Sequence, residues 1–195
     1  MQSRYEPSIP RALILSKLFD HFLQPALRSA GQPDCEAMSA RGFIKESIIH
    51  ASPERVFTFH ELPDALRRLT PPWESAHIVQ AAPDIKPGST AIIETRIFGL
   101  FPVRWVAEHT AYDPPYMFED VQVEGPFRRW RHRHIIKPHP EGAVLRDEIE
   151  YEPPLGFIGR LATPFIIVPR LEKVFEYRHR VTRDQPDSSL DLVIG

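Results

Sequence analysis

The sequence predicts an α+β domain, and the order of its patterned segments is the main reason. One strand-like run comes first, two short helical segments follow, six strand-like runs come next, and one long helical segment ends the pattern. Turn-rich separators such as PDIKPG, DPP and PHPEG divide the strand-like runs. Consecutive strands with the helices kept apart from them are typical of α+β folds.

The composition is that of a globular protein, and it narrows the function classes. Of 195 residues, 42% are hydrophobic and 26% are charged, and the formal net charge is −2. This balance provides no overall attraction to nucleic acid, so we expect no nucleic-acid partner. The single cysteine, Cys35, cannot form an intramolecular disulfide or a multi-cysteine zinc motif, which fits a cytoplasmic location. No apolar run approaches the roughly 20 residues of a transmembrane helix.

The ends of the chain lie outside the predicted domain. Residues 1–41 are expected to form a helical extension and a linker, because apolar residues recur at helical spacing within residues 11–28. This helix would pack on the domain or on a protein partner of unknown identity, with weak peripheral membrane contact as the alternative. Residues 42–183 form the predicted domain, and residues 184–195 form a C-terminal tail.

A strand and two short helices begin the domain. Residues 43–50 have strand composition. Ser52 is a suitable N-cap for the first helix, and Pro53 stands at its first helical position. The second helix opens at Pro63–Asp64 and ends before the two prolines at 71–72.

Six strands and a long helix complete the domain. The strands are predicted at residues 76–82, 89–99, 103–112, 116–125, 127–137 and 143–152. The final helix is predicted over residues 157–183, where Pro164 and Pro169 are expected to kink it or divide it in two. Near its end, Arg178 and His179 are expected on an exposed face, although Tyr177 or Arg178 could reach the interior.

A family resemblance supports this interpretation of the elements. It rests on their order and on three stretches: ASPERVFTFHELPDALRRLTPPWE, GPFRRWRHRH and EYEPPLG. Over about residues 42–182 the chain resembles the START/Bet v 1-like superfamily, and within it the polyketide cyclase/dehydrase-like branch. The resemblance implies a helix-grip fold, in which a curved antiparallel sheet of about seven strands surrounds a long C-terminal helix and leaves a cavity. Lipid carriers, hormone receptors, cyclases and quinone-binding proteins share that fold, so it implies no single activity.

The stretch RRWRHRH, residues 128–134, divides its side chains between the two faces of one predicted strand. Trp130, His132 and His134 share one face, because side chains alternate along a strand. The arginines at positions 129, 131 and 133 share the other face. The question is whether these arginines form a nucleic-acid patch or have acidic partners within the sheet.

Two predicted hairpins provide acidic partners. A two-residue turn at Gly125–Pro126 would pair Glu124 with Phe127. It would also place three residues opposite the next strand: Gln122 opposite Arg129, Asp120 opposite Arg131, and Glu119 opposite His132. A turn at residues 139–142 would set three further acidic residues opposite the arginines: Glu152, Glu150 and Glu148. We therefore expect an outer face of neutralised, solvated charge.

The functional site is predicted on the opposite face of this strand. His132 would face Glu119, and His134 would face Asp147, among apolar neighbours. By the resemblance, this is the concave face that looks towards the C-terminal helix. The expected ligand-binding residues are Trp105, His109, Glu119, Val121, Trp130, His132, His134, Asp147 and Tyr151.

Histidine beside carboxylate in an apolar wall fits several roles. Such pairs can orient the oxygens of a ligand, neutralise one another in a structural network, or act as general acid and base. For catalysis the candidates are His132, His134, Asp147 and Glu119. Metal coordination would be a further role, but no HExxH or comparable spacing is present, so we expect no metal and no cofactor.

Three functional hypotheses follow. The first is a protein that binds a small hydrophobic or aromatic ligand, lipid-, polyketide- or quinone-like, in a cavity between the sheet and the final helix. A cyclase or dehydratase that uses the histidine–carboxylate pairs is the second hypothesis. In the third, the protein acts through a partner that binds the helix within residues 11–28.

Overall fold

The computed structural model describes residues 41–97 and 101–184, and it confirms the predicted α+β helix-grip fold. The described residues form one antiparallel sheet with the strand order β1-β7-β6-β5-β4-β3-β2. The helix predicted within residues 11–28, the linker after it and the C-terminal tail lie outside the described residues.

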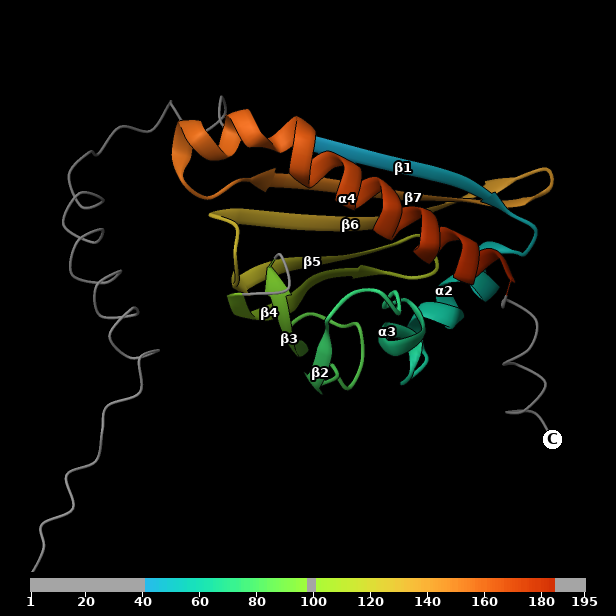
Figure 1. The fold of residues 1–195 in the computed structure, drawn as a ribbon. Coiled ribbons are helices and arrows are strands. Elements are labelled where there is room, and N and C mark those ends of the chain that lie inside the picture. Colours follow the sequence, from blue (N-terminus) through green and yellow to red (C-terminus); the bar gives the residue numbers. More distant parts are fainter. Residues whose placement is uncertain (1–40, 98–100, 185–195) are drawn as a thin grey trace, which may run out of the picture. The chain divides into compact units, whose positions relative to one another are not determined.

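The elements follow one another as the sequence predicts (Figure 1). The strands are β1 (Arg41–Ile49), β2 (His77–Gln80), β3 (Thr90–Ile97), β4 (Phe101–Asp113), β5 (Met117–Glu124), β6 (Arg129–His139) and β7 (Gly142–Glu152). The helices are α2 (Pro53–Glu61), α3 (Ala65–Arg68) and α4 (Gly156–Asp184).

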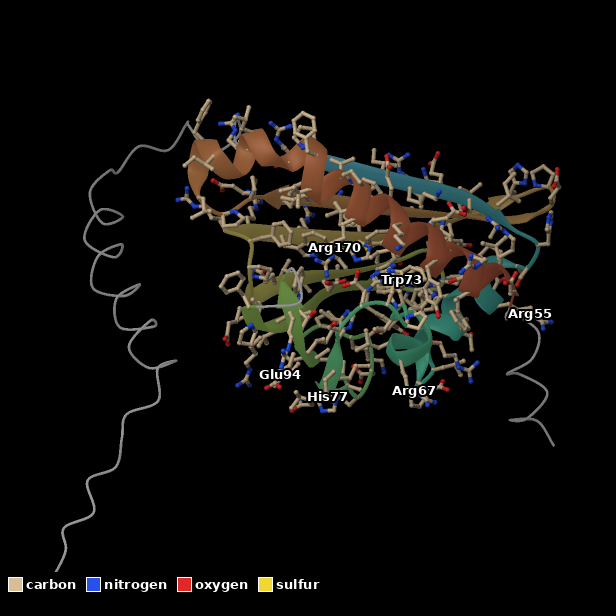
Figure 2. The ribbon with its side chains drawn as sticks, viewed as in Figure 1. Arg55, Arg67, Trp73, His77, Glu94 and Arg170 are labelled. Atoms are coloured by element: carbon tan, nitrogen blue, oxygen red, sulfur yellow. The ribbon has the colours of Figure 1, made fainter. Side chains whose placement is uncertain are left out.

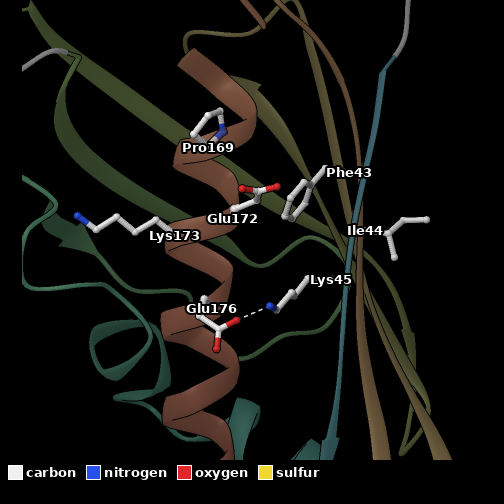
Figure 3. Close-up of a pocket in the computed structure, with 7 residues that line it drawn as sticks. All are labelled: Phe43, Ile44, Lys45, Pro169, Glu172, Lys173 and Glu176. Atoms are coloured by element: carbon white, nitrogen blue, oxygen red, sulfur yellow. Dashed lines mark hydrogen bonds and ion pairs between the residues drawn. The ribbon is translucent and has the colours of Figure 1, made fainter. Parts of the chain in front are cut away.

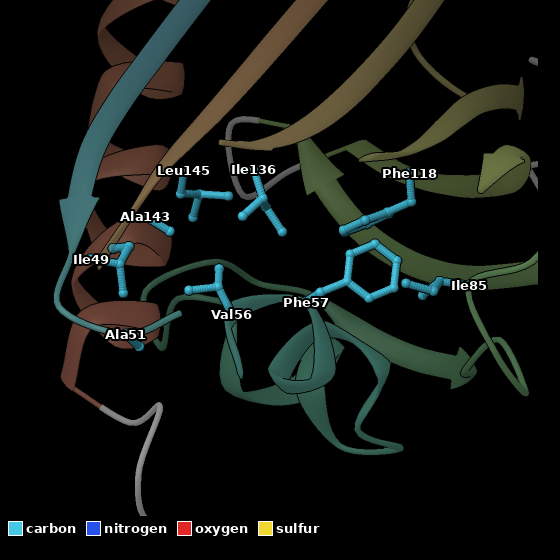
Figure 4. Packing of buried hydrophobic residues seen from close by; sticks show 9 residues of the cluster. All are labelled: Ile49, Ala51, Val56, Phe57, Ile85, Phe118, Ile136, Ala143 and Leu145. Carbon is cyan, nitrogen blue, oxygen red and sulfur yellow. The ribbon is translucent and has the colours of Figure 1, made fainter. Parts of the chain in front are cut away.

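Helix α2 begins with the predicted cap and closes one end of the interior. The Ser52 hydroxyl accepts a hydrogen bond from the Arg55 amide at 3.4 Å, and Pro53 follows the cap. Val56 and Phe57 then pack with apolar side chains of β5, β6 and β7, as Figure 4 shows. Phe57 meets Phe118 edge to face, with ring centroids 5.8 Å apart.

Helix α4 is longer and less broken than its sequence predicts. The helix continues through Pro164 and Pro169, so of the two predicted alternatives, a kink or a division in two, the division does not occur. Each proline removes one amide donor, and a helix gains most of its stability from tertiary packing. That packing lies in the second half of α4, where one face is buried: Leu171, Phe175, His179 and Thr182.

The first part of α4 is much more exposed. Its large apolar side chains at this end face solvent: Phe157, Ile158, Leu161, Phe165 and Ile166. By contrast, Phe175 further along contacts Phe43 of β1 at 5.6 Å between ring centroids. The attachment of α4 to the sheet therefore depends on its second half.

The segment that follows α3 also contacts α4 (Figure 2). Trp73 packs edge to face on Tyr177, with ring centroids 5.2 Å apart. The neighbouring Glu74 pairs with Arg170. The Tyr177 hydroxyl and the Arg178 guanidinium donate to the backbone carbonyls of Arg68 and Leu69. These contacts hold the segment after α3 against the middle of α4.

The pairing of β6 with β7 confirms the predicted register. Trp130 lies opposite Tyr151, His134 opposite Asp147, and Lys137 opposite Val144. The tight turn between His139 and Gly142 connects the two strands, as expected. The three arginines of β6 therefore lie opposite the three predicted glutamates of β7.

The predicted pairing of β5 with β6 is wrong by one residue. In the structure Asp120 lies opposite His132 and Glu119 lies opposite Arg133. The predicted two-residue turn does not form, because β5 ends at Glu124 and β6 starts only at Arg129. Because the side-chain period of a strand is two, this shift exchanges the faces of the β5 side chains.

The Gln122 side chain stabilises the longer connection. Its amide nitrogen donates to the Phe127 carbonyl at 2.7 Å, and its amide oxygen accepts from the Phe127 N–H at 3.3 Å. The side chain thereby replaces the backbone pair that a two-residue turn would have formed.

We expect Gln122→Ala to lower the free energy of unfolding by about 1–2 kcal/mol, because two partly buried hydrogen bonds are lost. Gln80→Ala is the matched control, since its amide makes one long, exposed contact of 3.5 Å with the Thr90 carbonyl. Urea unfolding of both variants measures the difference. Equal losses in the two variants would contradict a specific role for Gln122.

Candidate functional site

Strand β6 separates its side chains as predicted. Trp130, His132 and His134 are buried on the inner face, with exposed fractions of 8%, 3% and 8%. Arg129 is exposed, and the arginines at 131 and 133 are half-buried on the outer face. The imidazoles and the indole therefore lie under α4, while the guanidinium groups lie outside.

The outer face is a network of neutralised charge. Glu119 Oε2 accepts from Arg131 at 2.6 Å and from Arg133 at 2.9 Å, and Thr110 donates to Oε1 at 2.8 Å. The same two arginines also lie 3.8 and 3.7 Å from Glu150 and Glu148 of β7. Burial raises the pKa of Glu119, but these hydrogen bonds outweigh burial and lower it overall.

Two expected site residues lie elsewhere than the sequence predicts. Glu119 and Val121 lie on the outer face, opposite Arg133 and Arg131, and not on the concave face. The cause is the one-residue shift of β5 described above. Asp120 takes the interior position that was predicted for Glu119.

Asp147 is the centre of the interior site. Its Oδ1 lies 3.0 Å from His132 Nε2 and 2.7 Å from His134 Nδ1. Its Oδ2 lies 2.7 Å from His179 Nε2 of α4. The contact with His134 is close but is not aligned as a hydrogen bond. One carboxylate thus joins two imidazoles of the sheet to one imidazole of the helix.

Asp120 contacts the other side of the same two sheet imidazoles. Its Oδ2 lies 3.4 Å from His132 Nδ1 and 3.7 Å from His134 Nε2. The two imidazole rings are adjacent, with centroids 3.9 Å apart. Each imidazole therefore has a carboxylate at both of its nitrogens.

This arrangement changes the titration of its members. Burial lowers the pKa of His132, but the carboxylates of Asp120 and Asp147 outweigh burial and raise it to about 9. Burial raises the pKa of the two aspartates, yet the imidazoles hold both carboxyl pKa values well below their usual range. His132 and the two carboxylates therefore form a buried network of charge.

The sequence analysis did not place His60, Asp120 and His179 in the interior site. The expected exposed position of His179 is wrong, because its side chain is fully buried. Asp120 lies opposite His132 and not opposite Arg131. His179 lies four residues after Phe175 and eight after Leu171, so it continues the buried stripe of α4. His60 similarly follows Val56 on α2, where its Nδ1 contacts the Val56 carbonyl at 2.8 Å. Burial and the neighbouring His134 lower the pKa of His60 to about 4. Helical spacing could have identified both histidines.

An aromatic wall adjoins this cluster. Trp105 of β4 packs edge to face on Trp130 at 5.1 Å between centroids, and Trp130 lies 6.2 Å from Tyr151. Phe127 contacts all three rings. Trp105 and Phe127 remain half-buried, whereas Tyr151 is fully buried and burial raises the pKa of its phenol. Three predicted site residues are thus together, with one edge of their wall accessible.

His109 lies on β4 directly opposite Asp120. Opposed residues of antiparallel strands present their side chains on the same face. Burial lowers the pKa of His109. Its Nδ1 is buried and has no hydrogen-bond partner among the described residues. The structure therefore leaves a free polar atom at the border of the cluster.

The hollows found at the surface of residues 41–97 and 101–184 lie apart from the interior cluster. An open groove of about 540 Å³ lies between β1 and α4, where Lys45 pairs with Glu176 (Figure 3). A second hollow of about 410 Å³ lies between the segment after α3 and the start of β2. The imidazoles of the interior cluster line neither of them.

The chemistry of the cluster allows three uses. Its imidazoles and carboxylates can hold the oxygen atoms of a bound molecule, or can transfer protons within hydrogen-bond distance. Asp120, His132 and His134 also offer three ligand atoms that all lie within 4.8 Å of one another, which is a spacing compatible with a metal ion.

Within the described residues, no helix has the length and apolar character needed to cross a membrane.

Asp147→Asn should lower the free energy of unfolding by about 3 kcal/mol, because it removes the charge that compensates the buried His132 imidazole. Glu150→Gln on the same strand is the control, and it should cost less than about 1 kcal/mol, since its pair with Arg131 is solvent-exposed. Chemical denaturation measures both values. A loss for Asp147→Asn no larger than that of the control would contradict the central role of this carboxylate.

Solved structures share the fold of this chain. The protein TTHA0849 of Thermus thermophilus matches with a TM-score of 0.61 and 19% identity, over 77% of this chain and 99% of that one. Norcoclaurine synthase of Thalictrum flavum, in complex with dopamine and hydroxybenzaldehyde, matches with a TM-score of 0.55 and 17% identity, over 82% and 96%. A nucleoside-diphosphate sugar epimerase of Corynebacterium glutamicum matches with a TM-score of 0.57 and 22% identity, over 73% of this chain but only 28% of that one.

Identities this low show a common fold alone. No match to the chain is found among curated proteins. A family model supplies the stronger assignment, because it matches residues 49–171, which include most of the sheet, both short helices and the start of the buried face of α4. The predicted resemblance to the START/Bet v 1-like superfamily is thereby confirmed. This chain belongs to the polyketide cyclase / dehydrase and lipid transport family.

Proposed function

We propose that the domain binds a small, largely apolar molecule between the sheet and α4. The apolar part of that molecule would lie along the wall of Trp105, Phe127, Trp130 and Tyr151. Its oxygen atoms would face the cluster of imidazoles and carboxylates beside the wall. Lipid-, polyketide- and quinone-like molecules combine these two features, and a cytoplasmic protein would meet them as free ligands or at a membrane surface.

One observation carries the proposal. Polar side chains from β5, β6, β7 and α4 converge at one place in the interior, immediately beside an aromatic wall that is only half-buried at Trp105 and Phe127. An apolar core that served packing alone would avoid burying these carboxylates, since each costs free energy to desolvate. A site with an apolar wall and a few convergent polar groups is typical of small-molecule binding.

The comparisons support a ligand of this kind. The family is described by polyketide cyclisation, dehydration and lipid transport, which all concern largely apolar molecules with oxygen atoms. The related norcoclaurine synthase structure contains dopamine and hydroxybenzaldehyde, both aromatic molecules with hydroxyl groups. For this chain, the proposed contacts with oxygen atoms come from His109, Asp120, His132, His134 and Asp147.

Trp105→Ala should weaken binding of the fluorescent apolar probe 1-anilinonaphthalene-8-sulfonate by about tenfold, or about 1.4 kcal/mol. Loss of the indole removes the half-buried edge of the aromatic wall. Trp73→Ala is the control, because Trp73 is an exposed indole that packs on Tyr177 of α4. A fluorescence titration with both variants gives the affinities.

An unchanged affinity in Trp105→Ala, or an equal loss in Trp73→Ala, would contradict a binding wall at Trp105. Native mass spectrometry of the freshly purified protein complements the titration. It should detect a co-purified small molecule. Displacement of that molecule by the probe would show that the two compete for binding.

Cyclase or dehydratase activity is the second candidate function. The observation in its favour is the contact of Asp147 with two imidazoles, since a carboxylate that orients a histidine is a common feature of general acid–base catalysis. His134→Gln should then retain probe affinity within about twofold and lose at least a hundredfold in turnover of the co-purified molecule or its close analogues. Retention of turnover would exclude His134 as acid or base.

A further inference from the structure

Three potential metal ligands come together at the inner face of β5 and β6. His132 and His134 are two residues apart on β6 and therefore share one face. Asp120 of β5 lies directly opposite His132. One ligand atom from each residue lies within 4.8 Å of the other two. The arrangement needs no helical HExxH spacing, because the antiparallel register brings the carboxylate to the histidines.

Two of the three separations between the ligand atoms suit a small divalent ion. Asp120 Oδ2 lies 3.4 Å from His132 Nδ1 and 3.7 Å from His134 Nε2. In tetrahedral coordination with bonds of about 2.0–2.1 Å, neighbouring ligand atoms are about 3.3 Å apart. The carboxylate–imidazole separations therefore differ from ideal values by only a few tenths of an ångström, which a side-chain rotation can provide.

Asp147 lies on the side of the two imidazoles that does not face Asp120. It contacts the opposite nitrogen of each imidazole, His132 Nε2 at 3.0 Å and His134 Nδ1 at 2.7 Å. His179 in turn contacts the second oxygen of Asp147 at 2.7 Å. Histidines that bind metals almost always have a carboxylate or carbonyl at the nitrogen that does not face the metal. Asp147 provides that partner for His132 by a hydrogen bond, and it lies close to His134 without the alignment of a hydrogen bond.

Charge and access are consistent with such an ion. Asp120 and Asp147 bring two carboxylates into the interior, and one divalent cation would offset their negative charge. The cluster also has an accessible edge, because the side chains of Asp120 and His134 are 16% and 11% exposed. The buried, unpartnered Nδ1 of His109 lies at the same border, across from Asp120.

We propose that Asp120, His132 and His134 bind a divalent transition-metal ion, with Asp147 positioning the two imidazoles. Two nitrogen ligands and one carboxylate favour Zn²⁺ and related ions over Mg²⁺ or Ca²⁺, which prefer oxygen ligands. Three protein ligands leave one position of a tetrahedral ion for solvent or for an oxygen of a bound molecule. This metal site does not depend on the apolar ligand proposed above.

The test is a titration of the full chain, free of histidine tags and stripped with EDTA, with Zn²⁺ alone. Isothermal titration calorimetry should show one tight site per chain, and Zn²⁺ should raise the unfolding temperature. Co²⁺ in place of Zn²⁺ should give the visible absorption bands of a four-coordinate ion. Mg²⁺ at the same concentration should show no tight binding by calorimetry and should not raise the unfolding temperature.

Two neighbouring carboxylates supply matched variants. Asp120→Asn should weaken Zn²⁺ binding by a hundredfold or more, because changes in outer residues alone commonly cost about 10- to 100-fold. Glu119→Gln should leave the affinity within about twofold, since Glu119 lies on the outer face with Arg131 and Arg133. His134→Gln serves as a second test if Asp120→Asn does not fold.

The outcomes separate a metal site from a self-neutralised network. A wild-type protein that binds no Zn²⁺ tightly would overturn the proposal and leave the cluster as a self-neutralised network. Zn²⁺ binding that survives both Asp120→Asn and His134→Gln would also overturn it, because the ion would occupy another site. Loss in these variants with retention in Glu119→Gln would establish it.

Discussion

The contacts of one carboxylate, Asp147, organise the interior of this domain. Asp147 is almost fully buried on β7 and contacts His132 and His134 of the neighbouring strand and His179 of α4. A buried carboxylate is costly unless charged or hydrogen-bonding groups surround it. The helix therefore has a specific partner on the sheet in addition to the apolar packing of Phe175 and Leu171. That contact and the apolar packing lie on the same face of α4.

A second constraint is the register of β5 against β6. Glu119 and Asp120 are adjacent, but the one-residue shift sends them to opposite faces. Glu119 joins the arginines of the outer face and stabilises the pairing of the strands. Asp120 joins the imidazoles of the inner face. The same stretch of acidic sequence thus supplies both a structural ion pair and a member of the candidate site.

The aromatic wall and the polar cluster meet along β6, because Trp130 and His132 are next to one another on its inner face. A molecule that packs on Trp105 and Trp130 would bring its polar end towards His132 and Asp120. A metal ion held by Asp120, His132 and His134 would lie beside the same region. The two proposals therefore describe adjacent parts of one interior surface, although each can be tested without the other.

The sequence by itself determined the fold class, the order of the elements, the faces of β6 and its register with β7. These follow from short-range rules: strand side chains alternate, and a tight turn between His139 and Gly142 sets the pairing beyond it. It therefore also identified His132, His134, Asp147, Trp130 and Tyr151 as neighbours. Family membership likewise followed from local stretches that the family model then matched.

Only the tertiary structure decided which acidic residue of β5 enters the site and which histidines join from the helices. The connection after β5 is closed by the Gln122 side chain rather than by a two-residue turn, and no local pattern specifies that choice. His179 lies in a polar stretch of sequence, but the packing of α4 buries it against Asp147. The candidate metal ligands come from two strands, so their proximity depends on inter-strand register and not on sequence spacing. Long-range pairing and helix rotation are properties of the assembled chain, because the energies that set them come from contacts between distant segments.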